Sequence, residues 1–267
     1  MAIMLMVLSP AKKLNFAPAP AGLALTAPEL RADTAELAQI TRKLRRADLM
    51  RLMSISDALA DLNYHRFQSF DPAGEDGLQA VMAFAGDVYD GLAARTLDKK
   101  ALAWAQEHLR ILSGLYGVLK PLDALQPYRL EMGTRLRTRR GSSLYDFWRT
   151  PIAETLSRDA DQRPDPTLVN LASAEYFGAV DTAALSVPFV TCHFKEHKAK
   201  GEAPRALMLF AKRARGLMAR YAIDRRIDRA EQLKAFDTAG YAYDPALSTK
   251  TDWVFTRPQP PPKATRS

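Results

Sequence analysis

The chain has 267 residues, a formal net charge of +8 and a hydrophobic fraction of 47%. These values are ordinary for a globular protein and exclude a chain that is disordered throughout. No apolar run is long enough to span a membrane, and the short apolar stretch at the N-terminus lacks the basic start and the length of a signal peptide. The single cysteine, Cys192, cannot form an internal disulfide, so we expect a reducing compartment and a cytoplasmic protein.

The N-terminal part of the sequence predicts a buried strand followed by helices. Residues Ile3–Leu8 are apolar, and Ser9-Pro10 ends the strand because proline cannot donate to a ladder. Lys12 therefore follows a strand end, which is where α/β proteins bind ligands. Helical spacing predicts consecutive helices within about residues 27–44, 47–53 and 57–67, with Ser56 as an N-cap.

The rest of the chain alternates between predicted strands and helices. Leu97–His108 predicts a helix, and Leu109–Val118 predicts one buried strand with a close backbone approach at its glycines. No repeat or interior linker divides the chain, so we expect a single domain over residues 1–256. Further strands are predicted at 168–172 and 188–195, a long helix within 206–226, and a disordered tail at 257–267, which holds four prolines.

The positive charge is concentrated in three segments. Residues 42–51, 129–140 and 212–229 carry net charges of +4, +4 and +5, so the remainder of the chain is net negative. Such concentration is typical of a protein with a polyanionic partner. The alternative is that the segments form three solvated faces that never meet in space.

The helix predicted around Phe210–Tyr221 separates into an apolar side and a basic side. Gly216 lies on the basic side, although glycine costs about 1 kcal/mol relative to alanine inside a helix. Either a ligand phosphate or another backbone approaching closely would explain this glycine.

Polar residues near the predicted strand ends have the chemistry of a catalytic pocket. A DNA-binding surface does not need acidic, amide and phenol groups there, whereas acid-base catalysis does. Arg129 and Glu131 alternate along an extended segment and share one face, so they are equally well explained as an ion pair that positions a strand. The candidate catalytic residues are Lys12, Asp87, Tyr89, Arg129, Glu131, Asn170 and Ser173.

The sequence offers little support for a metal site or for common cofactor chemistry. Cys192, His193 and His197 fall on a predicted strand, where residues four apart are separated by roughly 13 Å, too far to share one ion. Phosphate-binding, dinucleotide-binding and serine-hydrolase motifs are absent from the sequence. We therefore expect no metal and no cofactor.

Several motifs distributed along the chain resemble one family. The sequence reads SPAK at residues 9–12, FAGDVYDGL at 84–92, LRILSGLYGVLKPLDALQPYRLEMG at 109–133, LYDFW at 144–148, LVNLASAEYF at 168–177 and FAKRARGLMARY at 210–221. These motifs resemble the YaaA family of peroxide stress proteins. The resemblance covers nearly the whole chain, from residue 4 to 256.

The resemblance implies a soluble protein that is induced by hydrogen peroxide and limits iron-dependent damage to DNA. It also implies a mixed α/β (α+β) fold, with a central mixed β-sheet flanked by helices, a positively charged cleft and a small helix-hairpin-helix-like insertion that binds DNA. By position, this insertion maps to about residues 39–67. The segment 44–71 contains no glycine, so we expect contacts from side chains and helix N-termini and not from hairpin glycines.

These observations lead to two predictions of function. The first is non-specific or structure-selective DNA binding by a protein that is not bound to a membrane and is preferably monomeric. The second is an enzyme that acts on a nucleotide-like or other anionic small molecule in the same basic pocket; direct iron sequestration is the weakest alternative. The candidate DNA- or anion-binding residues are Lys12, Arg42, Lys43, Arg45, Arg46, Arg51, Arg129, Lys195, Lys212, Arg215 and Arg220.

Overall fold

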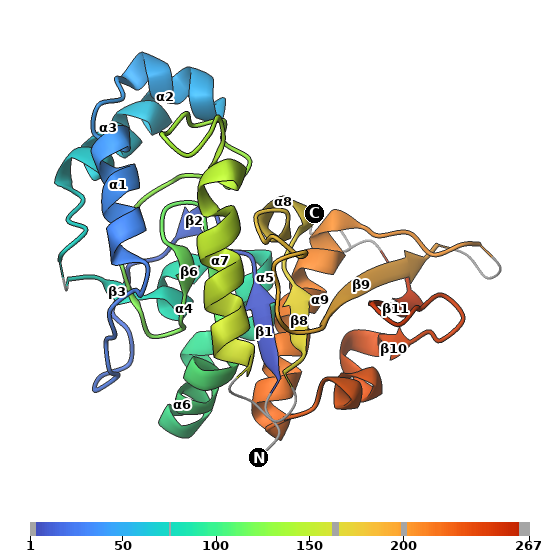
Figure 1. Ribbon diagram of the computed structural model, residues 1–267. Helices are drawn as coiled ribbons and strands as arrows, with labels where there is room; N and C mark the ends of the chain where they lie inside the picture. The colour runs from blue at the N-terminus through green and yellow to red at the C-terminus, as the bar shows by residue number, and fades with distance from the viewer. Residues whose placement is uncertain (1–3, 75, 162–165, 199–201, 262–267) are drawn as a thin grey trace, which may run out of the picture.

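A seven-stranded mixed β-sheet forms the centre of the molecule (Figure 1), seen in a computed structural model that describes residues 4–74, 76–161, 166–198 and 202–261. The strand order is β10-β11-β9-β8-β1-β5-β6, and the five strands from β11 to β5 are parallel. The outer strands β10 and β6 pair antiparallel. These strands are β1 (Leu5–Leu8), β5 (Leu109–Ser113), β6 (Gly117–Leu119), β8 (Leu168–Leu171), β9 (Phe189–His197), β10 (Ala242–Tyr243) and β11 (Asp252–Pro258).

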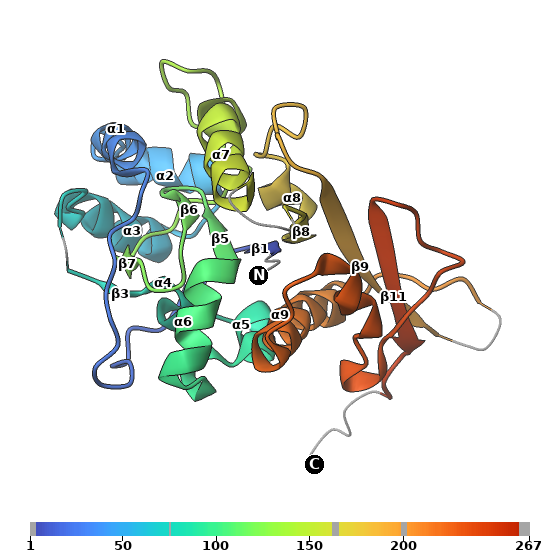
Figure 2. The same ribbon diagram turned by 60° about the horizontal axis from the view of Figure 1, so that its bottom comes forward.

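Helices cover both faces of the central strands (Figure 2). One face carries α7 and α8, and the other carries α6 and α9. The helices are α1 (Arg31–Thr41), α2 (Arg46–Met53), α3 (Asp57–Ser69), α4 (Ala80–Ala83), α5 (Asp87–Leu92), α6 (Lys99–His108), α7 (Leu144–Asp161), α8 (Ala174–Phe177) and α9 (Met208–Arg225), with short 3-10 turns at η1 (Ala94–Thr96), η2 (Ala230–Ala235) and η3 (Thr238–Gly240). Two small two-stranded sheets pair β2 (Lys13–Leu14) with β4 (Phe84–Ala85), and β3 (Leu78–Gln79) with β7 (Ala124–Leu125).

The burial of each strand matches its place in the sheet. All residues of β1 and β8 are buried, as expected for central parallel strands with helices on both faces. In β9, buried and half-buried residues alternate, so only one face of that strand is fully covered. The expected mixed α/β fold with a central mixed sheet flanked by helices is confirmed.

Two predicted elements have different boundaries from those expected. Residues 109–118 form the β5–β6 hairpin and not a single strand, because the Ser113 hydroxyl accepts the N–H groups of Leu115 and Tyr116 and closes a turn. The close backbone approach is confirmed, since a Cβ at Gly114 would lie 2.2 Å from the carbonyl oxygen of Leu130. The predicted tail starts too early, because Arg257 and Pro258 belong to β11; residues 262–267 lie outside the described ranges.

The helical insertion comprises α1, α2 and α3 at one end of the molecule (Figure 1). The first helix begins at Arg31, later than predicted, and the other two match the predicted positions. Ser56 caps α3 as expected, accepting the Leu59 N–H at 3.4 Å. Within the described ranges, no helix has the length and apolarity needed to cross a membrane.

Candidate functional site

The sheet has a topological switch point at the carboxyl ends of β1 and β8. These two strands are parallel neighbours. The next parallel strand in the chain after β1 is β5, which pairs with β1 on the side away from β8. The strand that follows β8 is β9, which pairs with β8 on the side away from β1. Because the connections leave in opposite directions, a crevice forms at this edge of the sheet, and α/β proteins bind ligands in such crevices.

A cavity of about 250 Å³, here called the strand-end cavity, occupies this crevice. Its walls come from the segment after β1, the start of α5, the segment after β8 and one side of α9. The structure thus brings together residues that are far apart in the sequence. Five predicted site residues line the cavity: Lys12, Asp87, Ser173, Lys212 and Arg215.

An ion-pair triad flanks the cavity. Lys12 Nζ lies 2.5 Å from Glu131 Oε2, and Arg129 Nη2 donates to Glu131 Oε1 at 2.8 Å. The side chains of Arg129 and Glu131 are 19% and 20% exposed, whereas that of Lys12 is 61% exposed. The interpretation of Arg129 and Glu131 as an internal ion pair is therefore supported, and the triad as a whole carries one net positive charge.

Arg215 is a half-buried cation without a carboxylate partner among the described residues. Its buried Nε has no hydrogen-bond acceptor, and burial lowers the pKa of the guanidinium. Lys212 precedes it by one helical turn on α9 and is exposed. Both side chains line the strand-end cavity.

Apolar residues such as Ala85 and Val88 also line the cavity, and hydroxyl and carboxylate groups supply its other polar side chains. Ser9 Oγ donates to Ser173 Oγ at 3.2 Å and accepts the Ser173 N–H at 2.8 Å, joining the two strand ends. Glu175 Oε1 accepts the Gly133 N–H at 3.2 Å. In the described part of the chain, nothing donates a hydrogen bond to the Asp87 carboxylate.

Two candidate catalytic residues have roles in holding the fold. Tyr89 is buried, and its hydroxyl donates to the Ser9 carbonyl oxygen at 3.1 Å. Asn170 accepts the Ala172 N–H at 2.8 Å and donates to Thr191 Oγ1 at 3.3 Å, linking β8 to β9. Neither residue lines the strand-end cavity.

Most cations of the helical insertion have partners. Arg42 donates to the carbonyl oxygens of Phe67 and Phe70 at the end of α3. Arg45 and Arg51 pair with Asp48 at 3.3 and 2.6 Å, and Arg46 pairs with Asp61 at 2.8 Å. Lys43 is exposed, and no carboxylate in the described ranges pairs with it.

Arg220 and Lys195 do not reach the strand-end cavity. Arg220 pairs with Asp224 at 2.8 Å and donates to Thr96 Oγ1 at 2.6 Å, so it joins α9 to the turn after α5. Lys195 lies on the half-buried face of β9, whereas Cys192 and Phe194 are buried on the face toward α9. Both residues were sequence candidates for anion binding, and neither joins Lys12, Lys212 and Arg215 in the cavity lining.

The structure bears on the metal interpretation of Cys192, His193 and His197 and on the phosphate interpretation of Gly216. Cys192 is buried, whereas His193 lies on the other face of β9 and bonds Asp252 at 2.8 Å. Residues 4–74, 76–161, 166–198 and 202–261 contain no group of three or more metal-binding side chains. The phosphate explanation of Gly216 is wrong, because this glycine packs against the backbone of α5, where a Cβ would lie 1.8 Å from the Val88 carbonyl oxygen.

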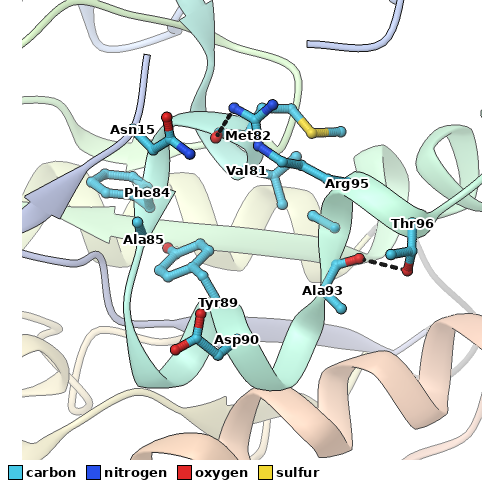
Figure 3. A pocket seen from close by; sticks show the side chains of 11 residues that line it. Asn15, Val81, Met82, Phe84, Ala85, Tyr89, Asp90, Ala93, Arg95 and Thr96 are labelled. Atoms are coloured by element: carbon cyan, nitrogen blue, oxygen red, sulfur yellow. Dashed lines mark hydrogen bonds between the residues drawn. The ribbon is translucent and has the colours of Figure 1, made fainter. Parts of the chain in front are cut away.

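A larger cavity of about 320 Å³ lies on another side of α5, lined by Phe84, Tyr89 and Arg95 (Figure 3). The Arg95 guanidinium in this cavity is already occupied, because it donates to the carbonyl oxygens of Ala17, Pro18 and Met82 at 2.9 to 3.1 Å. We therefore place the candidate site in the smaller cavity, where the cations Lys212 and Arg215 have no ion-pair partner among the described residues.

The candidate binding residues did not include three arginines of the basic segment 129–140, although their charge was counted there. Arg135, Arg137 and Arg139 are exposed, alternate with less exposed residues, and have no ion pair among the described residues. We call this segment, residues 134–140, the basic loop. The alternation of arginine with threonine and leucine in TRLRTRR is the signal that would have identified these three arginines as exposed.

Comparisons with known proteins agree with the motifs. Residues 4–247 match the family model described as "Peroxide stress protein YaaA". A UPF0246 protein of Caulobacter vibrioides is 66% identical over 257 residues, covering 96% of this chain and 100% of the relative. UPF0246 proteins of Phenylobacterium zucineum and Roseobacter denitrificans are 62% and 50% identical, covering 98% and 96% of this chain and 97% and 99% of the relatives. The chain therefore belongs to the family of peroxide stress protein YaaA.

Proposed function

We propose that this peroxide stress protein binds DNA through phosphate contacts on a surface formed by the basic loop and the helical insertion. The observation that carries the proposal is the set of three exposed arginines without ion-pair partners among the described residues, Arg135, Arg137 and Arg139. Arginine offers a planar fork of donors that matches phosphate oxygens. Phosphate contacts of this kind position a protein on DNA without reading its sequence.

The basic loop is held at both ends, which supports its use as a binding surface. At one end, the Gly133 N–H is bound by Glu175. At the other end, Arg140 pairs with Asp33 and Glu36 at 2.6 Å and lies 4.2 Å from the centre of the Phe147 ring. A loop that is already ordered loses less conformational entropy when it binds a ligand.

The helical insertion would add cations beside the basic loop. Both views place α2 at the same end of the molecule as the segment that leads into α7 (Figures 1 and 2). The ion pairs of Arg45, Arg46 and Arg51 are largely exposed, so they contribute little stability and can exchange a carboxylate for a phosphate. Lys43 would contribute a further charge without losing a partner.

The biological consequence of this binding would be protection of DNA during peroxide stress. We extend the proposal to a limit on iron-dependent oxidative damage, which rests on family membership alone. A deletion strain with raised DNA lesions after peroxide, restored by the wild-type chain and not by a chain defective in DNA binding, would support this part.

Affinity measurements on charge-matched variants test DNA binding itself. Replacing Arg135, Arg137 and Arg139 with Gln should weaken binding to duplex DNA by at least about tenfold at moderate salt, because three phosphate contacts are lost. The control carries Lys99→Gln, Lys100→Gln and Lys250→Gln, which remove the same charge from α6 and from the turn before β11. Equal affinities for the two triple variants would contradict the proposal.

A further inference from the structure

We propose that the strand-end cavity binds a small phosphomonoester that also carries hydroxyl groups, such as a sugar phosphate or a nucleoside monophosphate. This site is separate from the basic loop, and the inference does not depend on DNA binding. It rests on the composition of the cavity lining, on the missing partner of Arg215, and on the position of the cavity at the switch point of the sheet.

The unpaired state of Arg215 points to an anionic ligand. A charge that is taken out of water is costly unless an opposite charge or hydrogen bonds compensate it. Arg215 is half-buried, its Nε has no acceptor, and no carboxylate lies within ion-pair distance among the described residues. A phosphate in the strand-end cavity would supply the missing acceptors.

Two further cations surround the same cavity. Lys212 and Arg215 are three residues apart on α9, so their side chains lie on one side of the helix. Lys12 approaches from the end of β1, and its partner Glu131 also neutralises Arg129, which leaves this triad net positive. Three cations around one cavity match the charge of a dianionic phosphomonoester better than that of a single carboxylate.

The size of the cavity restricts the ligand. Its volume of about 250 Å³ lies slightly below the range of roughly 300 to 1,000 Å³ that is typical of sites for drug-sized ligands. A DNA duplex cannot enter such a space. One phosphate with a small organic group, or the phosphorylated end of a single strand, is the largest ligand that fits.

The carboxylates in the lining indicate what the organic group carries. Asp87 has unused acceptor capacity, and Glu175 uses one oxygen to hold Gly133. Bare phosphate would be repelled by these two groups. Hydroxyl groups on the same ligand would donate to them, which favours a sugar phosphate over inorganic phosphate.

Calorimetric titration with ribose 5-phosphate, inorganic phosphate and unphosphorylated ribose tests the inference. The wild-type chain should bind ribose 5-phosphate saturably and more tightly than inorganic phosphate, and should not bind ribose. Lys212→Gln should weaken binding by about tenfold or more, because it removes a charged hydrogen bond. Arg213→Gln, which removes the neighbouring charge from an exposed position outside the cavity lining, should change the affinity by less than about twofold.

Two further experiments test which functional groups of the ligand the site binds and whether the ligand is a free metabolite or the end of a strand. Asp87→Asn should weaken binding of ribose 5-phosphate more than binding of inorganic phosphate. A short single-stranded oligonucleotide with a terminal phosphate, compared with the same strand ending in a hydroxyl, distinguishes a strand end from a free metabolite. A preference for the phosphorylated strand that Lys212→Gln abolishes assigns the site to strand ends, and no preference assigns it to free phosphomonoesters.

Several outcomes would overturn the inference. These are no saturable binding of ribose 5-phosphate or of the phosphorylated strand, equal losses in Lys212→Gln and Arg213→Gln, and tighter binding of inorganic phosphate than of ribose 5-phosphate. The variant that lacks Arg135, Arg137 and Arg139 should keep full affinity for ribose 5-phosphate, so that a failure of DNA binding is distinguishable from a failure of this site. Thermal melting of each variant confirms that it is folded.

Discussion

Gly216 of α9 and Val88 of α5 meet so closely that a Cβ on Gly216 would lie 1.8 Å from the Val88 carbonyl oxygen. The reverse contact is similar, since a Cβ on Gly91 would lie 2.3 Å from the Arg213 carbonyl oxygen. The two helices therefore cross backbone to backbone. This crossing holds the start of α5, with Asp87, beside the side of α9 that presents Lys212 and Arg215.

Gly216→Ala should destabilise the fold by about 3 kcal/mol, because the added methyl group forces the two helices apart. Urea unfolding followed by circular dichroism measures the change. Arg213→Ala, at an exposed position of the same helix, is the control and should change the free energy of unfolding by less than about 0.5 kcal/mol. A Gly216→Ala protein as stable as this control would show that the crossing is looser than described.

The buried ion pair between Arg110 of β5 and Asp159 of α7 predicts a dependence of stability on pH. The two side chains are 3% and 10% exposed, and Arg110 Nε lies 2.7 Å from Asp159 Oδ2. Burial by itself raises the pKa of Asp159, but the guanidinium groups of Arg110 and, to a lesser extent, Arg158 outweigh that effect and hold the pKa of the carboxyl below its ordinary value. Asp159→Asn should lower the free energy of unfolding by about 3 kcal/mol at neutral pH, because it leaves a buried guanidinium without its counter-charge.

The sign of the pH effect follows from the lowered pKa of Asp159. The stabilisation is present above the unfolded pKa of about 4 and is lost as the pH falls through the lower pKa of the folded state. Urea unfolding measures the free energy of unfolding of wild type and of Asp159→Asn at pH 7 and near pH 3. The difference between the two proteins should therefore be smaller near pH 3 than at pH 7. A difference that stays constant, or grows, in acid would contradict this assignment.

The triad around Glu131 predicts two unequal couplings. Double-mutant cycles should give a coupling free energy of about 1 kcal/mol between Arg129 and Glu131, whose side chains are both mostly buried. The cycle for Lys12 with Glu131 should give less than about 0.5 kcal/mol, because the exposed lysine is screened by solvent. Equal couplings would mean that Lys12 is held more rigidly than its exposure indicates.

Arg42 and Lys43 are adjacent cations for which we predict opposite effects. Arg42→Gln should lower stability by about 1 kcal/mol, because it removes hydrogen bonds to carbonyl oxygens at the end of α3. Lys43→Gln should leave stability unchanged and weaken DNA binding instead. Thermal melting and DNA titration of both variants separate the two roles, and a stability loss in Lys43→Gln alone would reverse our assignment.

The elements with the clearest physical signals were predictable from the sequence. β1 is a continuous apolar run, β8 is apolar except for Asn170, and β9 alternates, so burial on both faces or on one face leaves a recognisable pattern. α7 was not predicted, because Pro151 inside it is normally a helix breaker. β11 was missed because its buried residues are consecutive and prolines follow it. The β5–β6 turn depends on Gly117 at a φ of +70°, which a local apolar run conceals.

The candidate site was predictable only in its residue types. Lys12 and Ser173 were identified because they follow predicted strands, and this placement holds. Strand order decides which strand ends are neighbours, and no local pattern encodes it. For the same reason, Lys195 was grouped with Lys212, although it lies on the other side of its strand. The roles of Glu175 and of the basic loop also depend on contacts made across the chain.

The salt dependence of DNA binding tests the proposed function most directly. Each phosphate contact adds about −0.9 to the slope of log affinity against log salt concentration. The wild-type slope should be steep, and replacing Arg135, Arg137 and Arg139 with Gln should reduce its magnitude by roughly 2.7. A wild-type affinity that does not respond to salt, or a slope that the triple substitution leaves unchanged, would contradict binding through the basic loop.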